Sequence, residues 1–257
     1  TLSSSSAASD VYKRQGKDIR PITVNVCNFT RPAGDQPALL RQEEAETLFH
    51  EFGHGLHSLL QHIHYRSLAR VPRDFVELPS QIMENWAFEP EVLKVYAKHY
   101  RTGAPIPDEL VKKIEDSAKY NQGFLTVEYL AASFLDMDWH TISAGQAPDA
   151  IAFEKAALEK IRMMPEIVVR YRSPYFQHIF AGGYSSGYYS YIWSEVLDSD
   201  AFQAFKEKGL FDQETARSFR KKILERGGTA EAMEMYKSFR GREPSVEPLL
   251  KKRGLKN

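Results

Sequence analysis

The stretch TLFHEFGHGLHSLL, from Thr47 to Leu60, decides the fold class and marks the first candidate site. Within its helical pattern, His50, Glu51 and His54 form an HExxH arrangement. Positions four apart lie one turn apart on the same helix face, so both imidazoles can face one metal ion, and Glu51 is turned towards the place of a bound water. A catalytic zinc site usually has three protein ligands, so this helix predicts a third ligand elsewhere in the chain.

The segment RDFVELPSQIMENW, residues 73–86, follows downstream as a second helical pattern. Its Glu77 and Glu84 lie two turns apart on one face. An isolated helix glutamate is most often solvated, but a glutamate on a helix that crosses the HExxH helix commonly completes a site of two histidines and one carboxylate. Pro79 would start or bend this helix. We therefore expect Glu77 as the third ligand, and Asp74 or Glu84 as acceptor of a ligand histidine's second N–H.

Outward from these two segments the pattern stays helical almost to the end of the chain. Near the N-terminus, alternating apolar residues within Asp18–Phe29 predict one strand or hairpin. The fold is therefore expected to be mainly α. Periodicity predicts helices over residues 40–62, 74–101, 107–138 with a break, 148–163, 184–207, 213–225, 229–239 and 244–253.

A third motif, HIFAGGYSSGYYSYIWSEV, spans residues 178–196. Tyr184, Tyr188 and Tyr191 are spaced i, i+4 and i+7, so a helix starting near Tyr184 would place the three hydroxyls on one face. A tyrosine stripe at this spacing is more often core than catalytic, because a phenol ring is good core material with a polar tip. The pattern alone leaves both interpretations open.

Composition excludes several classes of function. The 257 residues are 42% hydrophobic, which suits a globular protein with one large core or two modest ones. Lysine plus arginine equal aspartate plus glutamate at 34 each, so no basic field is available for nucleic acid or an anionic membrane surface. No apolar stretch approaches the roughly 20 residues of a membrane span. Cys27 is the only cysteine, which is compatible with a reducing compartment.

The motifs HEFGH, FVELPSQIMENW and HIFAGGYSSGYYSYIWSEV, in this order, resemble the thimet oligopeptidase family of zinc metallopeptidases. That family includes bacterial oligopeptidases and peptidyl-dipeptidases, and the similarity runs from about Pro21 to the C-terminus. It implies a multi-helical catalytic domain of the zincin type. It also implies one Zn²⁺ ion held by His50, His54 and Glu77, with Glu51 as the catalytic base.

The resemblance also assigns roles to the third motif. The expected donors to the transition state, which polarise the scissile carbonyl, are His178, Tyr188 and Tyr191. The expected substrate contacts are Tyr184, Gly182 and Gly183, since glycines let the backbone approach a bound peptide closely.

Two other segments bear on the mode of cleavage. VCNFTRPAGDQPALL, residues 26–40, and GREPSVEPLLKKRGL, residues 241–255, look more like the peptidyl-dipeptidases, which release dipeptides from the C-terminus of short peptides. Internal cleavage by an oligopeptidase is the close alternative. A zinc- and peptide-binding fragment that is inactive without a missing N-terminal half is a third. The resemblance implies a monomer when the protein is full length. Together with the single cysteine, it also leads us to expect a cytoplasmic protein.

The first residues call for a separate interpretation. SSAASDVYKRQ, residues 5–15, resembles the translation of a sequencing adapter. We therefore expect residues 1–15 to be an artefact without ordered structure, and residues 16–257 to form the catalytic metallopeptidase domain of a longer protein.

Overall fold

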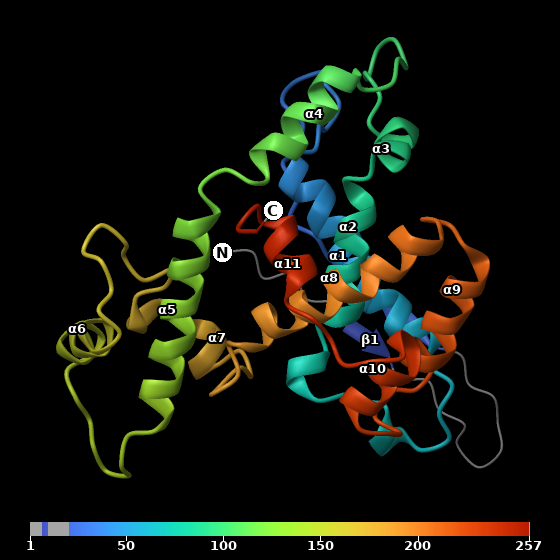
Figure 1. Ribbon diagram of the computed structural model, residues 1–257. Helices are drawn as coiled ribbons and strands as arrows, with labels where there is room; N and C mark the ends of the chain where they lie inside the picture. The colour runs from blue at the N-terminus through green and yellow to red at the C-terminus, as the bar shows by residue number, and fades with distance from the viewer. Residues whose placement is uncertain (1–6, 10–20, 257) are drawn as a thin grey trace.

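The structure is a computed structural model that describes residues 7–9 and 21–256 (Figure 1). The mainly α fold expected from the sequence is confirmed. Its α-helices are α1 (Gln42–Leu60), α2 (Leu78–Ala87), α3 (Pro90–Tyr96), α4 (Asp108–Ser117), α5 (Gln122–His140), α6 (Ala150–Lys160), α7 (Gln177–Phe180), α8 (Ser190–Lys208), α9 (Gln213–Phe219), α10 (Ala232–Arg240) and α11 (Glu247–Lys252). Short 3₁₀ turns lie at Arg66–Leu68, Arg73–Phe75 and Ser173–Tyr175, and a π-helical turn at Arg220–Leu224 extends α9.

The strand expected near the N-terminus is present and short. β2 (Ile22–Val24) pairs antiparallel with β1 (Ala7–Ser9), with Ala7 opposite Val24. Residues 1–15 lie outside the described residues except for β1. β2 also packs against α1, since a Cβ added at Gly55 of α1 would contact the methyl group of Thr23 in β2.

The single helix predicted over residues 74–101 is wrong. The chain there forms a 3₁₀ turn at Arg73–Phe75, then α2 and α3. Pro90 is the first residue of α3, and a proline disfavours helical geometry in the residue before it. Glu89 accordingly has extended torsion angles, φ −65° and ψ 133°, and separates the two helices.

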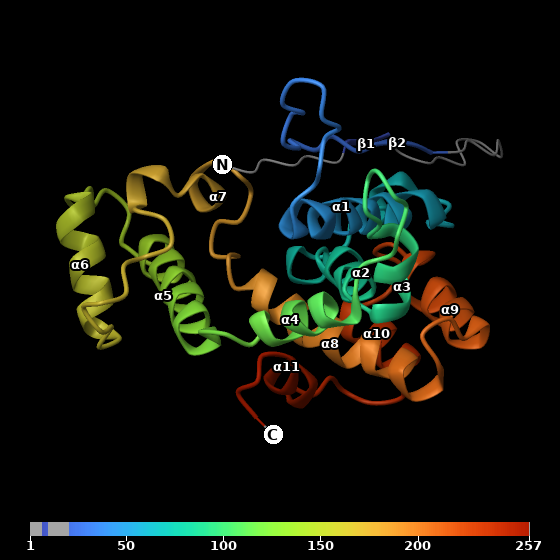
Figure 2. The same ribbon diagram turned by 90° about the horizontal axis from the view of Figure 1, so that it is seen from above.

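The main core lies between α2, α8 and the C-terminal helices. α8 packs along α2, and α2 packs along α1, so α2 is held on both sides (Figure 2). This arrangement fixes the start of α2, where the predicted third ligand lies, against α1. The buried residues of this core are Phe75, Leu78, Ile82, Leu197, Ala201, Phe202, Phe205, Phe219, Ile223, Leu224, Met235 and Tyr236.

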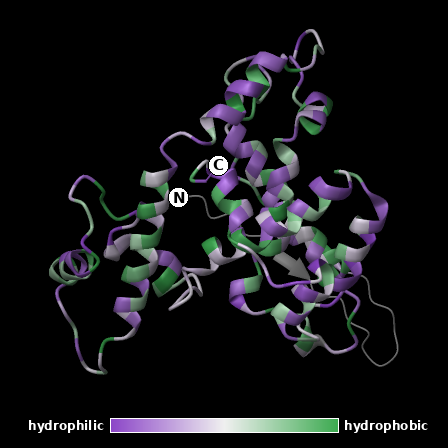
Figure 3. Ribbon diagram, viewed as in Figure 1, coloured by the Kyte–Doolittle hydropathy of each residue, from purple (hydrophilic) through white to green (hydrophobic). Residues whose placement is uncertain are grey.

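Helices α5 and α6 lie apart from the bundle of α1, α2 and α8 in both views (Figures 1 and 2). A small cluster of Ala132, Phe176, Ile179 and Tyr188 joins α5 to α7 and to the segment that leads into α8. Hydrophilic and hydrophobic residues are mixed along the helices (Figure 3). Among the described residues, no helix is both long and apolar enough to cross a membrane.

Candidate metal centre

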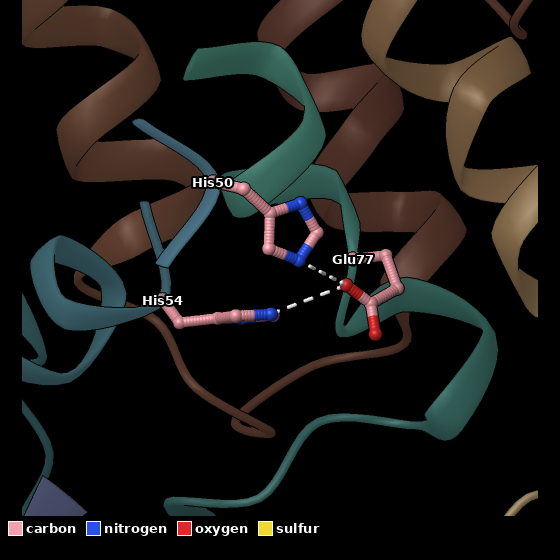
Figure 4. A group of neighbouring side chains, drawn as sticks. All are labelled: His50, His54 and Glu77. Atoms are coloured by element: carbon pink, nitrogen blue, oxygen red, sulfur yellow. Dashed lines mark ion pairs between the residues drawn. The ribbon is translucent and has the colours of Figure 1, made fainter. Parts of the chain in front are cut away.

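Two facing helices bring the three predicted metal ligands together. His50 and His54 come from α1, and Glu77 is the residue that precedes α2 (Figure 4). Oε2 of Glu77 lies 3.4 Å from Nε2 of His50 and 3.2 Å from Nε2 of His54. The ligand atoms of the three residues all lie within 4.8 Å of one another. In the described part of the chain, this is the one group of at least three histidine, cysteine or acidic residues that could hold a metal ion.

These distances fit a small tetrahedral ion. Ligand atoms bound at about 2.0–2.1 Å in tetrahedral geometry lie about 3.3–3.4 Å apart, which matches the two distances from Glu77. Two imidazole nitrogens with one carboxylate oxygen are also the donor set of many catalytic zinc sites. The residues present therefore fit zinc.

The carboxylate of Glu77 is oriented by two hydroxyl donors. Ser80 Oγ donates to Oε2 at 2.9 Å, and the hydroxyl of Tyr184 donates to Oε1 at 2.5 Å. Burial raises the pKa of Glu77, but hydrogen bonds from His50 and His54 outweigh burial and hold it well below the ordinary value. Glu77 is therefore an ionised, fixed carboxylate facing two imidazoles, which favours a bound cation.

The other face of His50 contacts Glu84. Nδ1 of His50 lies 2.5 Å from Oε1 of Glu84, one of the two acceptors left open by the sequence. Asp74, the other, accepts instead from the hydroxyl of Tyr189 at 2.9 Å. Burial lowers the pKa of His50, but its hydrogen bonds with Glu77 and Glu84 outweigh burial and raise it to about 10. Glu84 thus fixes the ring of His50 with Nε2 directed at the metal position.

Replacing Glu84 with glutamine should weaken metal binding. Loss of an outer-sphere carboxylate typically costs roughly 10- to 100-fold in metal affinity, because the ligand ring loses its orientation and basicity. Competition with a chromophoric chelator measures this affinity. The matched control is Glu91→Gln, which changes an exposed glutamate of α3. Equal affinities for the parent and Glu84→Gln would contradict this role for Glu84.

The approach of α1 to α2 depends on Gly53. A Cβ at this position would lie 2.3 Å from the carbonyl oxygen of Pro79 and 2.6 Å from Cα of Ser80. Both contacts are with backbone, which cannot move aside as a side chain can. Gly53 therefore allows α1 to pass so close to the start of α2 that its histidines reach Glu77.

The variant Gly53→Ala should both destabilise the chain and weaken metal binding. Overpacking a tight contact typically costs about 1–3 kcal/mol, and here it also separates the histidines from the carboxylate. Urea unfolding measures the first effect and chelator competition the second. The control is Gly123→Ala in α5, where an added Cβ meets nothing within 4 Å. If Gly53→Ala binds zinc as tightly as Gly123→Ala, the close approach does not set the metal geometry.

Glu51, the predicted base, is buried in α1 beside His50. The segment after β2 lies near it: burial raises the pKa of the Cys27 thiol, and the negative charge of Glu51 raises it further. Adjacent positions on a helix point about 100° apart, so Glu51 points in a different direction from the ligand His50. The group of possible ligands comprises His50, His54 and Glu77 and does not include Glu51.

The helix predicted to start at Tyr184 begins instead at Ser190, so the prediction of one helical stripe of tyrosines is wrong. Tyr184 and Tyr188 lie in an irregular segment before α8, in which Ser186 has a positive φ of 52°. This segment contacts the metal centre at Tyr184, whose hydroxyl donates to Glu77. Tyr191, one residue into α8, stacks on Tyr184 with ring centroids 4.8 Å apart.

The rings of the predicted donors lie close to one another. The ring of His178 lies 5.6 Å from that of Tyr188 and 6.3 Å from that of Tyr191, centroid to centroid. Burial raises the pKa of Tyr184 to about 12 and raises that of Tyr188 and Tyr191 as well. Burial and the nearby charge of Arg170 lower the pKa of His178. The phenols are therefore protonated and the imidazole is neutral at neutral pH, so each can donate a hydrogen bond.

Tyr188 also satisfies the core interpretation. Its ring is buried and packs edge-on against Phe176, with centroids 4.9 Å apart.

Gly182 and Gly183 form an exposed turn between α7 and this segment, and Gly183 has a φ of 80°. Sequence reasoning missed Arg73, whose guanidinium lies 4.6 Å from the ring centre of Tyr184. Its position at the start of RDFVELPSQIMENW, four residues before Glu77, was the available signal.

Comparison with known proteins agrees with this geometry. The sequence profile of Peptidase family M3 matches residues 4–255. The chain is 45% identical over 239 residues to a dipeptidyl carboxypeptidase of Escherichia coli (strain K12), covering 91% of this chain and 35% of that protein. It is 43% identical over 251 residues to oligopeptidase A of the same organism, covering 95% and 36%.

A eukaryotic relative, saccharolysin of Saccharomyces cerevisiae, is 33% identical over 243 residues, covering 92% of this chain and 34% of that protein. The chain thus spans about a third of the length of the curated relatives it matches. Because the family profile matches nearly the whole chain, the chain belongs to Peptidase family M3.

Proposed function

We propose that this chain carries the catalytic site for zinc-dependent hydrolysis of peptide bonds in short peptides. The observation that supports this most is the convergence of His50, His54 and Glu77 at tetrahedral ligand spacing, with the buried Glu51 next to His50 in the sequence of α1. Residues 16–257 would form this catalytic domain. The site would hold one zinc ion, which when bound supplies Lewis-acid polarisation of the scissile carbonyl and an acidified water.

Different side chains then transfer the protons and stabilise the developing negative charge. Glu51 accepts a proton as water attacks the carbonyl carbon, and it later donates that proton to the leaving amine. The carbon–nitrogen bond breaks and leaves a carboxylic acid and an amine. The developing oxyanion accepts hydrogen bonds from Tyr188, Tyr191 or His178, and one such preorganised donor is worth roughly 2.7–4 kcal/mol. Tyr184, Gly182 and Gly183 contact the bound peptide.

For the mode of cleavage we propose release of dipeptides from the C-terminus. Two segments, residues 26–40 and 241–255, support this mode because they look more like the peptidyl-dipeptidases. The similarity to a dipeptidyl carboxypeptidase supports it as well. Internal cleavage remains the alternative, supported by the nearly equal identity to oligopeptidase A.

A third possibility is a zinc- and peptide-binding unit that needs further chain to turn over. The chain spans about a third of its relatives, and α1 exposes Leu48 (40%) and Phe52 (48%) beside the histidines. Exposed apolar side chains on the helix that carries the ligands are sites where more protein could pack. For the complete protein we propose a cytoplasmic monomer that acts on short peptides.

The test uses the 257-residue chain loaded with zinc and an unblocked peptide of about ten residues, followed by mass spectrometry. A matched peptide with a C-terminal amide lacks the carboxylate that a dipeptide-releasing enzyme would recognise. Dipeptide release from the free peptide alone supports the proposed mode. Internal cuts in both peptides support the oligopeptidase. Bound zinc with no cleavage of either peptide supports the third possibility, and a folded chain that binds no zinc overturns the proposal.

A further inference from the structure

Residues 184–189, which precede α8 and are called the tyrosine segment below, are held in place by side chains of α5. Asp136 of α5 is completely buried and accepts two backbone hydrogen bonds from this segment. Its Oδ1 accepts from the N–H of Ser186 at 3.0 Å, and its Oδ2 accepts from the N–H of Tyr188 at 2.9 Å. One carboxylate thus spans the turn that carries the tyrosines.

The backbone at this turn needs such a restraint. Ser186 has a φ of 52°, in the left-handed region that residues other than glycine rarely adopt. A strained conformation persists only where the surroundings determine it. The N–H of Ser186 is one of the two donors to Asp136, so the hydrogen bond acts at the strained residue itself.

Two further side chains of α5 complete the attachment. Nδ1 of His140 lies 2.8 Å from Oδ1 of Asp136, which gives the buried carboxylate a third polar partner. The hydroxyl of Tyr129 donates to the carbonyl oxygen of Tyr188 and accepts from the N–H of Ile192 at 3.3 Å. α5 therefore holds the segment at Ser186, at Tyr188 and at the first turn of α8.

The attachment to α5 matters for the metal centre because the tyrosine segment and the start of α8 carry phenol groups that lie near Glu77. Tyr184 precedes the turn and donates to Glu77, and Tyr191 follows the turn and stacks on Tyr184. A change of backbone angles at Ser186 would move both phenols relative to Glu77. The group that fixes those angles is far away in sequence and lies on a helix that stands apart from the bundle (Figure 1).

We infer that Asp136 is a positioning residue for turnover: it sets the backbone of the tyrosine segment and thereby places the hydrogen-bond donors at the metal centre. This inference rests on the proposed peptide hydrolysis. Asp136 touches no reacting atom, so its loss should lower kcat while zinc stays bound. A misplacement of catalytic groups by about 1 Å can cost roughly 100-fold in rate.

The test is Asp136→Asn in the full 257-residue chain loaded with zinc. The amide has nearly the shape of the carboxylate, but its NH₂ group faces one of the two backbone N–H groups. We expect kcat to fall about 10- to 100-fold, KM to change much less, and bound zinc to remain stoichiometric. Amide hydrogen exchange should become faster at Ser186 and Tyr188. The matched control is Asp138→Asn, two residues along α5, where Asp138 pairs with the exposed Lys160 at 2.7 Å.

Several outcomes decide the matter. Equal kcat and equal exchange in Asp136→Asn and Asp138→Asn overturn the inference, as does a loss of kcat without faster exchange at Ser186 and Tyr188. If Asp136→Asn does not fold, Ser186→Pro removes the N–H that donates to Asp136 and, because proline fixes φ at about −65°, also forces the turn out of its φ of 52°. Unchanged kcat in that variant overturns the inference. If the parent cleaves no peptide, the proposed function fails, whereas the exchange measurement still decides whether Asp136 holds the segment.

Discussion

The variant Glu51→Gln is expected to lose peptide hydrolysis and to keep its zinc. Glutamine has the size of glutamate and can replace it in the buried position on α1, but it cannot accept and return a proton at neutral pH. General base catalysis contributes roughly 10²- to 10⁴-fold, and the same group would also serve as the acid in the second half of the reaction, so the loss should lie at the upper end. Zinc remains because the three ligands are unchanged.

Elemental analysis and initial rates on the same preparation test this prediction. The control is Glu43→Gln, an exposed glutamate in the first turn of the same helix, which should match the parent in both measurements. Residual activity of Glu51→Gln above a tenth of the parent would assign the base to another group. Loss of zinc together with activity would instead mean that Glu51 supports the ligand geometry.

The ligand set could be predicted from sequence because its geometry is local. The spacing of His50 and His54 follows from the helical repeat, which α1 keeps from Gln42 to Leu60. Glu77 could be favoured because a carboxylate on a crossing helix is a common third ligand. Which outer carboxylate serves His50 could not be predicted, because Glu84 lies in α2 and Asp74 in the 3₁₀ turn before it, and the choice between them depends on how these elements lie against α1.

The tyrosine segment shows what helical spacing alone cannot reveal. The i, i+4, i+7 pattern of Tyr184, Tyr188 and Tyr191 predicted one helix face, yet the three rings meet through an irregular turn. That turn depends on Asp136, whose two backbone donors are 50 and 52 residues away in the chain. Asp136 lies near the C-terminal end of α5, and an aspartate within a helix has no sequence signature that distinguishes an attachment to a distant backbone from a solvated position.

The role of Gly53 likewise could not be predicted from the sequence. Within HEFGH this glycine reads as a neutral spacer in a helix, and a glycine inside a helix is normally a small cost. Its value becomes visible only when the backbone of Pro79 and Ser80 is in place against it. Gly53 is therefore required where α1 crosses the start of α2, and the periodicity of the sequence could not locate this crossing.

The variant Glu77→Gln is expected to lose zinc, and with it all hydrolysis. Two imidazoles would remain, and the neutral amide would no longer supply the negative charge that faces them. The amide also mismatches its surroundings, because both Ser80 and Tyr184 donate to the present carboxylate and the new NH₂ group would meet one of these donors. Glu77→Asp keeps the charge but withdraws it by one methylene, so it should bind zinc more weakly than the parent and more tightly than Glu77→Gln.

Thermal unfolding with and without zinc gives a readout that does not depend on activity. A ligand that binds only the folded chain at 100 times its Kd stabilises that chain by about 2.7 kcal/mol, so chelation should lower the Tm of the parent. The Tm of Glu77→Gln should be the same with and without zinc, whereas Glu91→Gln on α3 should respond like the parent. A zinc-dependent Tm in Glu77→Gln would show that the two histidines find their third ligand elsewhere. Since Glu77 is the carboxylate at ligand distance from both imidazoles, we expect no such response.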